Sequence, residues 1–491
     1  MPGIRYSFGD FELDTHHRRL RRAAAPVPLP DRHFEVLQQL VSHPGTVLSK
    51  DALVAAGWGD VAVTDNSLEQ AVSALRRALG SQPGGGPFIE TVPRRGYRFA
   101  AEVTRAAARE SDASLDALLA PHRAWIEGRA ALETLERPQI LHAREVFDRL
   151  LAAAPEQPLA HVGLANACAM QFETTRADER PDLAALERAA RHAREGCRLD
   201  PHSGEAWATL GFVLDRSGQH TDAVAALRRA VALEPDNWRH HVRLAYASWG
   251  EERLRAARRT LTLLPGLPLA HWLAATVHVA RHVLDEAERE LTSGIGMRER
   301  QGEHVRFSAV ALHWLRGLIH LARGAEEAAL ADFERELSYE AAGHLYGREC
   351  CANTWYAIGV LRARQDRMAE ARHAFAQAIA RVAAHPLAHL TLAAASAASG
   401  DPHVAAAGAD ARARVARAGS RLPVVEAALC RAAELTLRGD HAGAADTAAA
   451  ALAAAPPGSA GWLIPVEPLL NAAAHPQAWA AALERLRVRA A

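Results

Sequence analysis

The pattern of apolar and polar positions divides the chain into two parts. Up to about residue 103, short alternating or β-branched stretches are mixed with amphipathic helices, and from about residue 120 onward the pattern is helical and repetitive. In the first part the predicted order is short strands, three helices and a hairpin. The strand candidates are 5–8, 11–14, 18–22 and 27–29, and the helix candidates are 30–42, 51–56 and 67–79.

These patterns predict a multidomain chain. We expect a domain of mixed helices and strands (α+β) over residues 1–103 and an all-α repeat domain over residues 119–491. Residues 104–118 are small and charged, which indicates a linker or a helical connector between the two domains.

The segment 66–100 carries the clearest functional pattern. Its helix, 67–79, has apolar residues at spacings of four, three and four, so one face is apolar and the other is polar or short. The apolar positions are Leu68, Val72, Leu75 and Leu79. Two stretches typical of strands, 88–92 and 97–100, then flank a Pro-Arg-Arg-Gly turn, which predicts a hairpin with two arginines at its tip. A helix followed by a basic hairpin suits DNA, with the helix in a major groove and the arginines on the adjacent backbone or minor groove.

Repeats dominate the second part. Pro201 and Pro235 are 34 residues apart, which is the tetratricopeptide period. Small Gly211 and Ala223 stand where two helices of one unit would touch, and larger apolar residues fill the space around them. We expect eight to ten helix pairs in a tetratricopeptide-type superhelix, ending in one or two capping helices over 462–491.

Composition and charge indicate the cellular compartment of the protein but do not identify its binding partner. The chain has 57 basic and 57 acidic residues, so no global field attracts nucleic acid, although residues 66–98 carry a local net charge of +3. Five cysteines, with adjacent Cys350 and Cys351 badly placed to bridge each other, fit a reducing cytoplasm. No apolar run reaches about 18 residues, so we expect no transmembrane helix and no membrane partner.

No motif for catalysis or metal binding stands out. The chain has no GxxxxGK[ST] phosphate loop, no GxSxG and no HExxH. Adjacent histidines, at 16–17 and 240–241, point about 100° apart if helical and rarely share one ion. We therefore expect a protein that is not an enzyme and that has no cofactor and no metal.

The string WGDVAVTDNSLEQAVSALRRALG, followed by FIETVPRRGYRF, resembles the winged helix-turn-helix DNA-binding domain of OmpR/PhoB-type regulators. It is most similar to the variant with this domain at the N-terminus and tetratricopeptide repeats behind it (CadC/HilA-like). The resemblance covers about residues 4–103 and implies that the helix 67–79 is the recognition helix. The residues implied or expected at the DNA are Trp58, Asn66, Ser67, Glu69, Gln70, Ser73, Ala74, Arg76, Arg77, Thr91, Arg94, Arg95 and Tyr97.

Individual roles differ within this set. Gln70 is the best candidate for reading a base, because its amide can bond adenine in two places. Arg76, one step from Leu75, is expected to have a phosphate or structural role, and the ring of Tyr97 is expected to pack in the sheet. Asn66 or Ser67 can also cap the helix.

The resulting hypothesis is a cytoplasmic transcriptional regulator that binds double-stranded promoter DNA. The repeats would supply self-association on DNA, effector sensing, RNA polymerase contact, or a site for a protein or peptide partner. The alternative is a scaffold or adaptor whose winged domain binds protein instead of DNA. No receiver domain precedes the winged domain in this sequence, so aspartyl phosphorylation is not expected to be its switch within phosphorelay signalling. Without a transmembrane helix, it also differs from the membrane-bound regulators of the same type.

Overall fold

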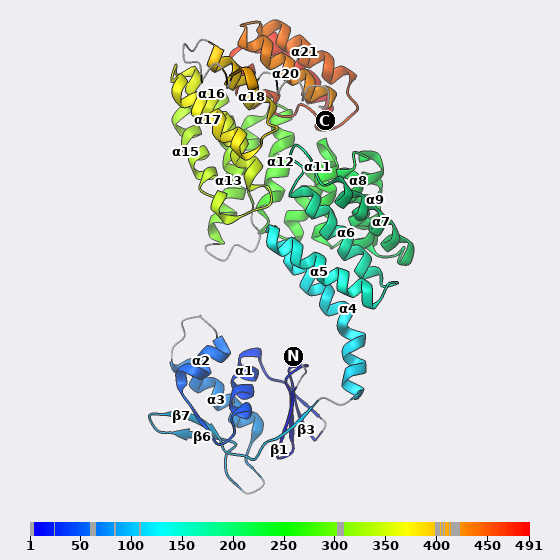
Figure 1. Cartoon of the computed structure of the whole chain (residues 1–491), viewed down its shortest axis with the longest axis vertical. Helices are drawn as coiled ribbons and strands as arrows, with labels where there is room; N and C mark the ends of the chain where they lie inside the picture. The colour runs from blue at the N-terminus through cyan, green and yellow to red at the C-terminus, as the bar shows by residue number, and fades with distance from the viewer. Residues whose placement is uncertain are drawn as a thin grey trace. The chain divides into compact units, whose positions relative to one another are not determined.

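The structure is a computed structural model, shown in Figure 1. It describes residues 4–23, 25–58, 65–82, 85–107, 110–301, 309–397, 403, 406, 408–411, 413 and 423–491; for residues 65, 66, 106, 107 and 110–118 it describes the backbone alone. The chain forms two compact units, residues 1–120 and 121–491.

Two antiparallel sheets and three helices build the first unit. One sheet has the order β4-β3-β2-β1-β8 and the other the order β5-β7-β6. The strands are β1 Ile4–Phe8, β2 Phe11–Asp14, β3 Arg19–Arg22, β4 Ala25–Val27, β5 Val47–Leu48, β6 Ile89–Val92, β7 Gly96–Phe99 and β8 Thr104–Ala107. The helices are α1 Asp31–Ser42, α2 Lys50–Trp58 and α3 Asp65–Leu79. This order confirms the predicted strands, helices and hairpin.

The core of this unit joins both sheets to the helices. Phe8 on β1 meets Phe11, Phe88 and Phe99 with ring centroids 5.0–5.7 Å apart. Apolar side chains of all three helices complete the core, including Leu37 and Leu40, Leu53, Leu68 and Leu75, each fully buried. Because the same core holds α3 and the β6–β7 hairpin, the two elements keep a fixed relative position within the unit.

Two strands of this unit have no counterpart in the sequence prediction. Residues 104–107, expected in a linker, form β8 and pair with β1 from Ile4 to Ser7. The two-residue β5 pairs with β7 through Val47 and Leu48. Residues 104–107 lie in a stretch of small and charged residues without a strand pattern, and β5 has only two residues, so pairing with a distant strand defines both.

The second unit consists of consecutive helix pairs. Eight pairs lie within the described residues: α4–α5, α6–α7, α8–α9, α10–α11, α12–α13, α14–α15, α16–α17 and α20–α21. Their bounds are α4 Glu110–Glu133, α5 Arg137–Ala153, α6 Pro158–Glu173, α7 Leu183–Leu199, α8 Gly204–Arg216, α9 His220–Leu233, α10 Trp238–Ala247, α11 Gly250–Leu263, α12 Pro268–Ala280, α13 Leu284–Arg300, α14 Leu312–Ala322, α15 Glu326–Leu337, α16 Gly347–Arg364, α17 Met368–Arg381, α20 Val424–Leu437 and α21 His441–Ala454. Helices α18 Pro386–Ala397 and α22 Pro476–Arg489 add to these pairs, and three short 3₁₀ turns lie between helices: η1 Glu340–Ala342, η2 Ile464–Val466 and η3 Ala472–Ala474.

Close helix contacts explain the small residues of the repeats. A Cβ on Gly211 would lie 2.5 Å from Leu227 and 2.9 Å from the Ala223 carbonyl oxygen, so only glycine fits. The same contact recurs in a later pair, where a Cβ on Gly359 would lie 2.4 Å from the ring of Phe375. The repeated glycine opposite a large side chain therefore sets the spacing of successive pairs.

The C-terminal segment 462–491 contains one capping helix, which is the smaller number of the one or two predicted. One capping helix, α22, is present, but residues 462–475 form an irregular path with η2 and η3 in place of a second helix. Pro465 and Pro468 lack the backbone N–H groups that a continuous helix needs. Among the helices that the structure describes, none is long and apolar enough to cross a bilayer.

Candidate nucleic-acid interface

Helix α3 presents two contrasting faces. Leu68, Val72, Leu75 and Leu79 are at most 1% exposed and face the core, as the periodicity predicts. On the other side Glu69, Gln70, Ser73 and Arg77 are exposed, while Ser67 and Ala74 are half-buried. The exposed face is thus polar and almost neutral in net charge, and a base edge could approach it.

Arg76 lies between these faces and points to the hairpin. Its Nε donates to the carbonyl oxygen of Ile89 at 2.9 Å and its Nη2 donates to Oγ1 of Thr91 at 2.7 Å. The guanidinium also lies 5.9 Å from the ring centroid of Tyr97. Of the two roles considered for Arg76, these contacts support the structural one, because they bind α3 to β6.

Two ion pairs remove further charge from the surface. Lys50 at the start of α2 lies 2.9 Å from Oε1 of Glu69 on α3, a contact that the sequence analysis did not anticipate. On the hairpin, Nη2 of Arg98 lies 2.6 Å from Oε2 of Glu90 on the paired strand. Part of the local positive charge is therefore balanced within the fold.

The tip of the β6–β7 hairpin, here called the wing, is a fixed turn. The backbone N–H of Arg95 donates to the carbonyl of Val92 at 3.0 Å. Pro93 and Arg94 fill its centre, and the φ of Arg94, +62°, has the sign that a type II turn needs at this position. Gly96 follows at φ +127°, and a Cβ there would lie 1.9 Å from the Leu48 carbonyl oxygen. Glycine is thus required where β5 crosses the base of the wing.

Three arginines remain available to a ligand. Arg77, Arg94 and Arg95 are exposed, and none forms an ion pair with the described residues. Because Arg76 binds α3 to β6, Arg77 and the wing arginines belong to one rigid surface. This surface is cationic without an internal counter-charge, which suits an anionic backbone.

The remaining predicted residues lie in varied settings. Thr91 is exposed on β6, but its hydroxyl accepts from Arg76. Tyr97 is 5% exposed, so its ring packs in the sheet as expected. Trp58 is half-buried at the end of α2 and packs against the core. Residues 59–64 and the side chain of Asn66 lie outside the described residues.

The second unit has no comparable reactive centre among its cysteines. All five cysteines are free thiols. Burial raises the pKa of Cys351 to about 12 and raises that of Cys350 well above its usual value, so both stay protonated at neutral pH. In the part of the chain that the structure describes, no group of three or more His, Cys, Asp or Glu residues could hold a metal ion.

Comparisons with known proteins agree with the fold of each unit. Residues 24–99 match the family described as "Transcriptional regulatory protein, C terminal", and residues 204–247 match the tetratricopeptide repeat. Over 95 residues the chain is 36% identical to the transcriptional regulator HilA of Salmonella typhimurium, covering 19% of this chain and 17% of HilA. Over 100 residues it is 37% identical to the transcriptional regulatory protein CseB of Streptomyces coelicolor, covering 19% of this chain and 39% of CseB.

A solved structure also aligns with the first unit. The DNA-binding domain of E. coli CadC is 28% identical, and the alignment covers 21% of this chain and 96% of that domain with a TM-score of 0.19. The chain spans less than half of the length of HilA and of CseB. The matched family and the two curated relatives are named as regulators of transcription.

Proposed function

We propose that this chain, which carries an OmpR/PhoB-type winged helix domain followed by tetratricopeptide repeats, is a DNA-binding transcriptional regulator. In this proposal α3 enters a major groove, where Gln70, Ser73 and Arg77 contact base edges. Arg94 and Arg95 contact the flanking backbone or minor groove. Two features together carry the proposal. One is the exposed, polar and nearly neutral face of α3. The other is the set of three exposed arginines, Arg77, Arg94 and Arg95, which form no ion pair with the described residues. Action on promoter DNA implies a cytoplasmic location.

The repeat unit has a separate proposed role. Stacked helix pairs present extended surfaces that bind peptides or other copies of the chain. We therefore propose that residues 121–491 couple DNA binding to self-association on DNA or to a protein partner, RNA polymerase included. Coupling of this kind raises the effective affinity without a new contact to DNA.

Site selection from random duplexes, with the full chain at low salt, tests the DNA-binding proposal. We expect one enriched motif, in tandem copies about one helical turn apart. Enrichment of no motif would contradict DNA recognition and would support the adaptor alternative, in which the winged unit binds protein.

The wing is tested by the salt dependence of binding to the selected site. We propose the double variant Arg94→Asn/Arg95→Gln, because asparagine tolerates the positive φ at position 94 while it removes the charge. Loss of two phosphate contacts should flatten the plot of log K against log salt by about 1.8. Between 50 and 200 mM salt, the wild type should then lose about 12-fold more affinity than the variant.

A matched control separates the wing from general charge. Arg21→Gln removes an exposed arginine from β3, which belongs to the other sheet of the same unit. The control should bind with the wild-type slope. An equal change of slope in the control and the double variant, or none in either, would contradict the wing assignment.

A further inference from the structure

Residues 456–475 connect α21 to α22 without forming a helix pair. The stretch contains only the short turns η2 and η3. It runs along the first helices of three successive pairs: η2 contacts α12 and α14, and the residues after it bond to α16. The chain thus lies across three repeats in the manner of a bound, irregular peptide.

Apolar anchors hold the first half of this stretch. The ring of Trp462 meets that of Trp272 on α12 edge-on, with centroids 6.1 Å apart and an interplanar angle of 85°. Ile464 and Val466 follow at 1% and 2% exposure. Edge-to-face aromatic pairs are a favoured geometry, so an aromatic side chain is well received at this position.

Polar anchors hold the second half. The hydroxyl of Tyr356 on α16 donates to Oε1 of Glu467 at 2.7 Å, and the N–H of Leu470 donates to Oε2 at 2.6 Å. Arg364, also on α16, donates to the carbonyl oxygen of Pro468. The repeats therefore offer a hydroxyl to a carboxylate and a guanidinium to a backbone carbonyl.

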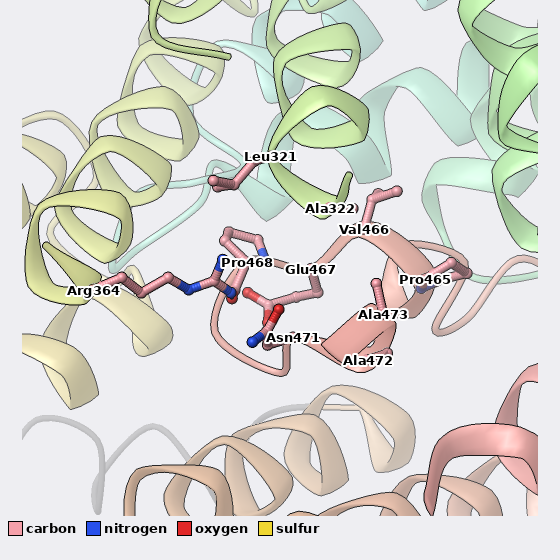
Figure 2. A pocket seen from close by; sticks show the side chains of 10 residues that line it. All are labelled: Leu321, Ala322, Arg364, Pro465, Val466, Glu467, Pro468, Asn471, Ala472 and Ala473. Atoms are coloured by element: carbon pink, nitrogen blue, oxygen red, sulfur yellow. The ribbon is translucent and has the colours of Figure 1, made fainter. Parts of the chain in front are cut away.

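A small cavity borders the polar half of this segment. Figure 2 shows Arg364, Glu467 and Asn471 around a remaining cavity of about 10 Å³, bordered by Leu321 and Ala322 of α14. A space of that size holds about one water molecule. Burial raises the pKa of Glu467, which shows that the site disfavours its charged form. Burying a carboxylate here has a desolvation cost that a purely apolar contact does not have.

We propose that Trp272, Tyr356 and Arg364, here called the inner groove, form the partner-binding site of the repeat unit and that residues 462–470 occupy it in the isolated chain. The partner is an extended peptide with an aromatic residue and, five residues later, a carboxylate, which is the spacing of Trp462 and Glu467. Binding requires displacement of the chain's own segment. The inference rests on the partner-binding role proposed above for the repeats.

A labelled peptide tests the inner groove. The probe is a fluorescein-labelled peptide of residues 459–474, and the protein is the full chain as wild type, Trp462→Ala or the control Val488→Ala. Trp462→Ala loosens the internal competitor, whereas Val488 on α22 is 62% exposed. We expect anisotropy to show at least tenfold tighter binding to Trp462→Ala than to wild type, because a tethered competitor acts at about millimolar effective concentration. Equal binding to all three proteins, or binding to none, would overturn the proposal.

A second measurement needs no variant protein. Millimolar peptide added to the wild-type chain should speed hydrogen exchange at the amide of Leu470, which loses its bond to Glu467 on displacement. A peptide with Trp462→Ala and Glu467→Ala should have a much smaller effect. Unchanged exchange with the native peptide would refute the groove even if Trp462→Ala failed to fold.

DNA binding of the same samples separates this proposal from the first one. Peptide binding without DNA binding would refute the regulator and leave the inner groove standing. DNA binding without peptide binding would refute the groove alone, because the winged unit contributes no residue to it.

Discussion

Arg76 and Arg77 are neighbours in the sequence, but the structure gives them opposite roles. Arg76 bonds to Ile89 and Thr91 on β6, whereas Arg77 is exposed and has no ion pair with the described residues. We therefore predict that Arg76→Ala lowers stability without changing the salt dependence of DNA binding. Arg77→Ala should do the reverse.

The two bonds of Arg76 set the size of its effect. A hydrogen bond from a charged group contributes about 1.5–3 kcal/mol, and the bond to Thr91 is solvent-exposed, so the pair together should contribute about 2 kcal/mol. Removal should lower the free energy of local opening of α3 and β6 by about that amount. Hydrogen exchange of amides in these two elements, measured in the full chain, should then become about 30-fold faster.

The effect of Arg77 follows from counterion release. In the major groove the Arg77 guanidinium neutralises about one phosphate charge while it contacts a base edge, so its loss flattens the salt plot by about 0.9, which is about a 3.5-fold smaller loss of affinity between 50 and 200 mM salt. Because Arg77 bonds to no described residue, exchange in α3 should match the wild type. Anisotropy titrations across this range of salt measure the slope.

Lysine variants supply the controls. Arg76→Lys keeps the positive charge, but its single ammonium group cannot reproduce the two bonds of the planar guanidinium. This variant should therefore keep the slope of the salt plot and lose part of the stability. Arg77→Lys should keep both. If Arg76→Ala flattened the salt plot by about 1 while exchange stayed unchanged, Arg76 would contact phosphate and the structural assignment would be wrong.

Two further predictions concern charge. Glu69→Gln should tighten binding to random-sequence DNA, because it removes from the exposed face a carboxylate that would repel the phosphates; unchanged titrations would contradict this placement. The second prediction concerns His385, which forms two hydrogen bonds of 3.1 Å. Its Nδ1 accepts from the N–H of Ala388 and its Nε2 donates to Oδ1 of Asn353. Because one ring nitrogen accepts and the other donates, the imidazole in this arrangement is neutral. Burial lowers the pKa of His385 to about 4, whereas the unfolded chain has the ordinary value, so stability is lost as pH falls from about 6.5 toward 4. Urea unfolding should show about 2 kcal/mol lost between pH 7 and pH 5 through this group, and His385→Gln should show a smaller loss; an equal loss would refute the assignment.

The sequence predicts helix α3 well for a physical reason. Its apolar face is periodic, so local spacing alone decides which side chains are buried and which remain exposed. The wing is also determined by nearby residues. Pro93 and Gly96 favour a tight turn, and the side chains of the two arginines between them are exposed to solvent. These are the parts of the candidate site that need no distant contact.

Other features depend on contacts between residues that are far apart in the sequence, and local spacing does not predict them. Arg76 reaches residues 13 and 15 positions away, and Lys50 meets Glu69 at a distance of 19 positions. Strand β8 exists because β1 offers an open edge, not because residues 104–107 alternate. Pairing of this kind becomes visible only after the helices and sheets are placed.

In the C-terminal stretch, the residues that prevent a helix are visible in the sequence, but the surface that the stretch contacts is not. The repeat pattern predicts one or two capping helices over 462–491, and Pro465 and Pro468 are incompatible with a continuous helix through the first half of that segment. What the sequence could not show is the partner surface that receives the irregular chain. That surface combines Trp272 of α12 with Tyr356 and Arg364 of α16, so it draws on two different repeats.

Because few arginines are available to DNA, the first unit needs the repeat unit for stable binding. Contacts from three arginines would give a salt slope of about 2.7, and one winged unit would lose about 40-fold in affinity between 50 and 200 mM salt. Stable occupancy of a promoter then requires a second contact, and joining two modules supplies it at about millimolar effective concentration. In the proposed mechanism the repeat unit provides this second contact. A partner that displaces residues 462–470 from the inner groove would therefore determine when the weakly charged recognition surface occupies its site.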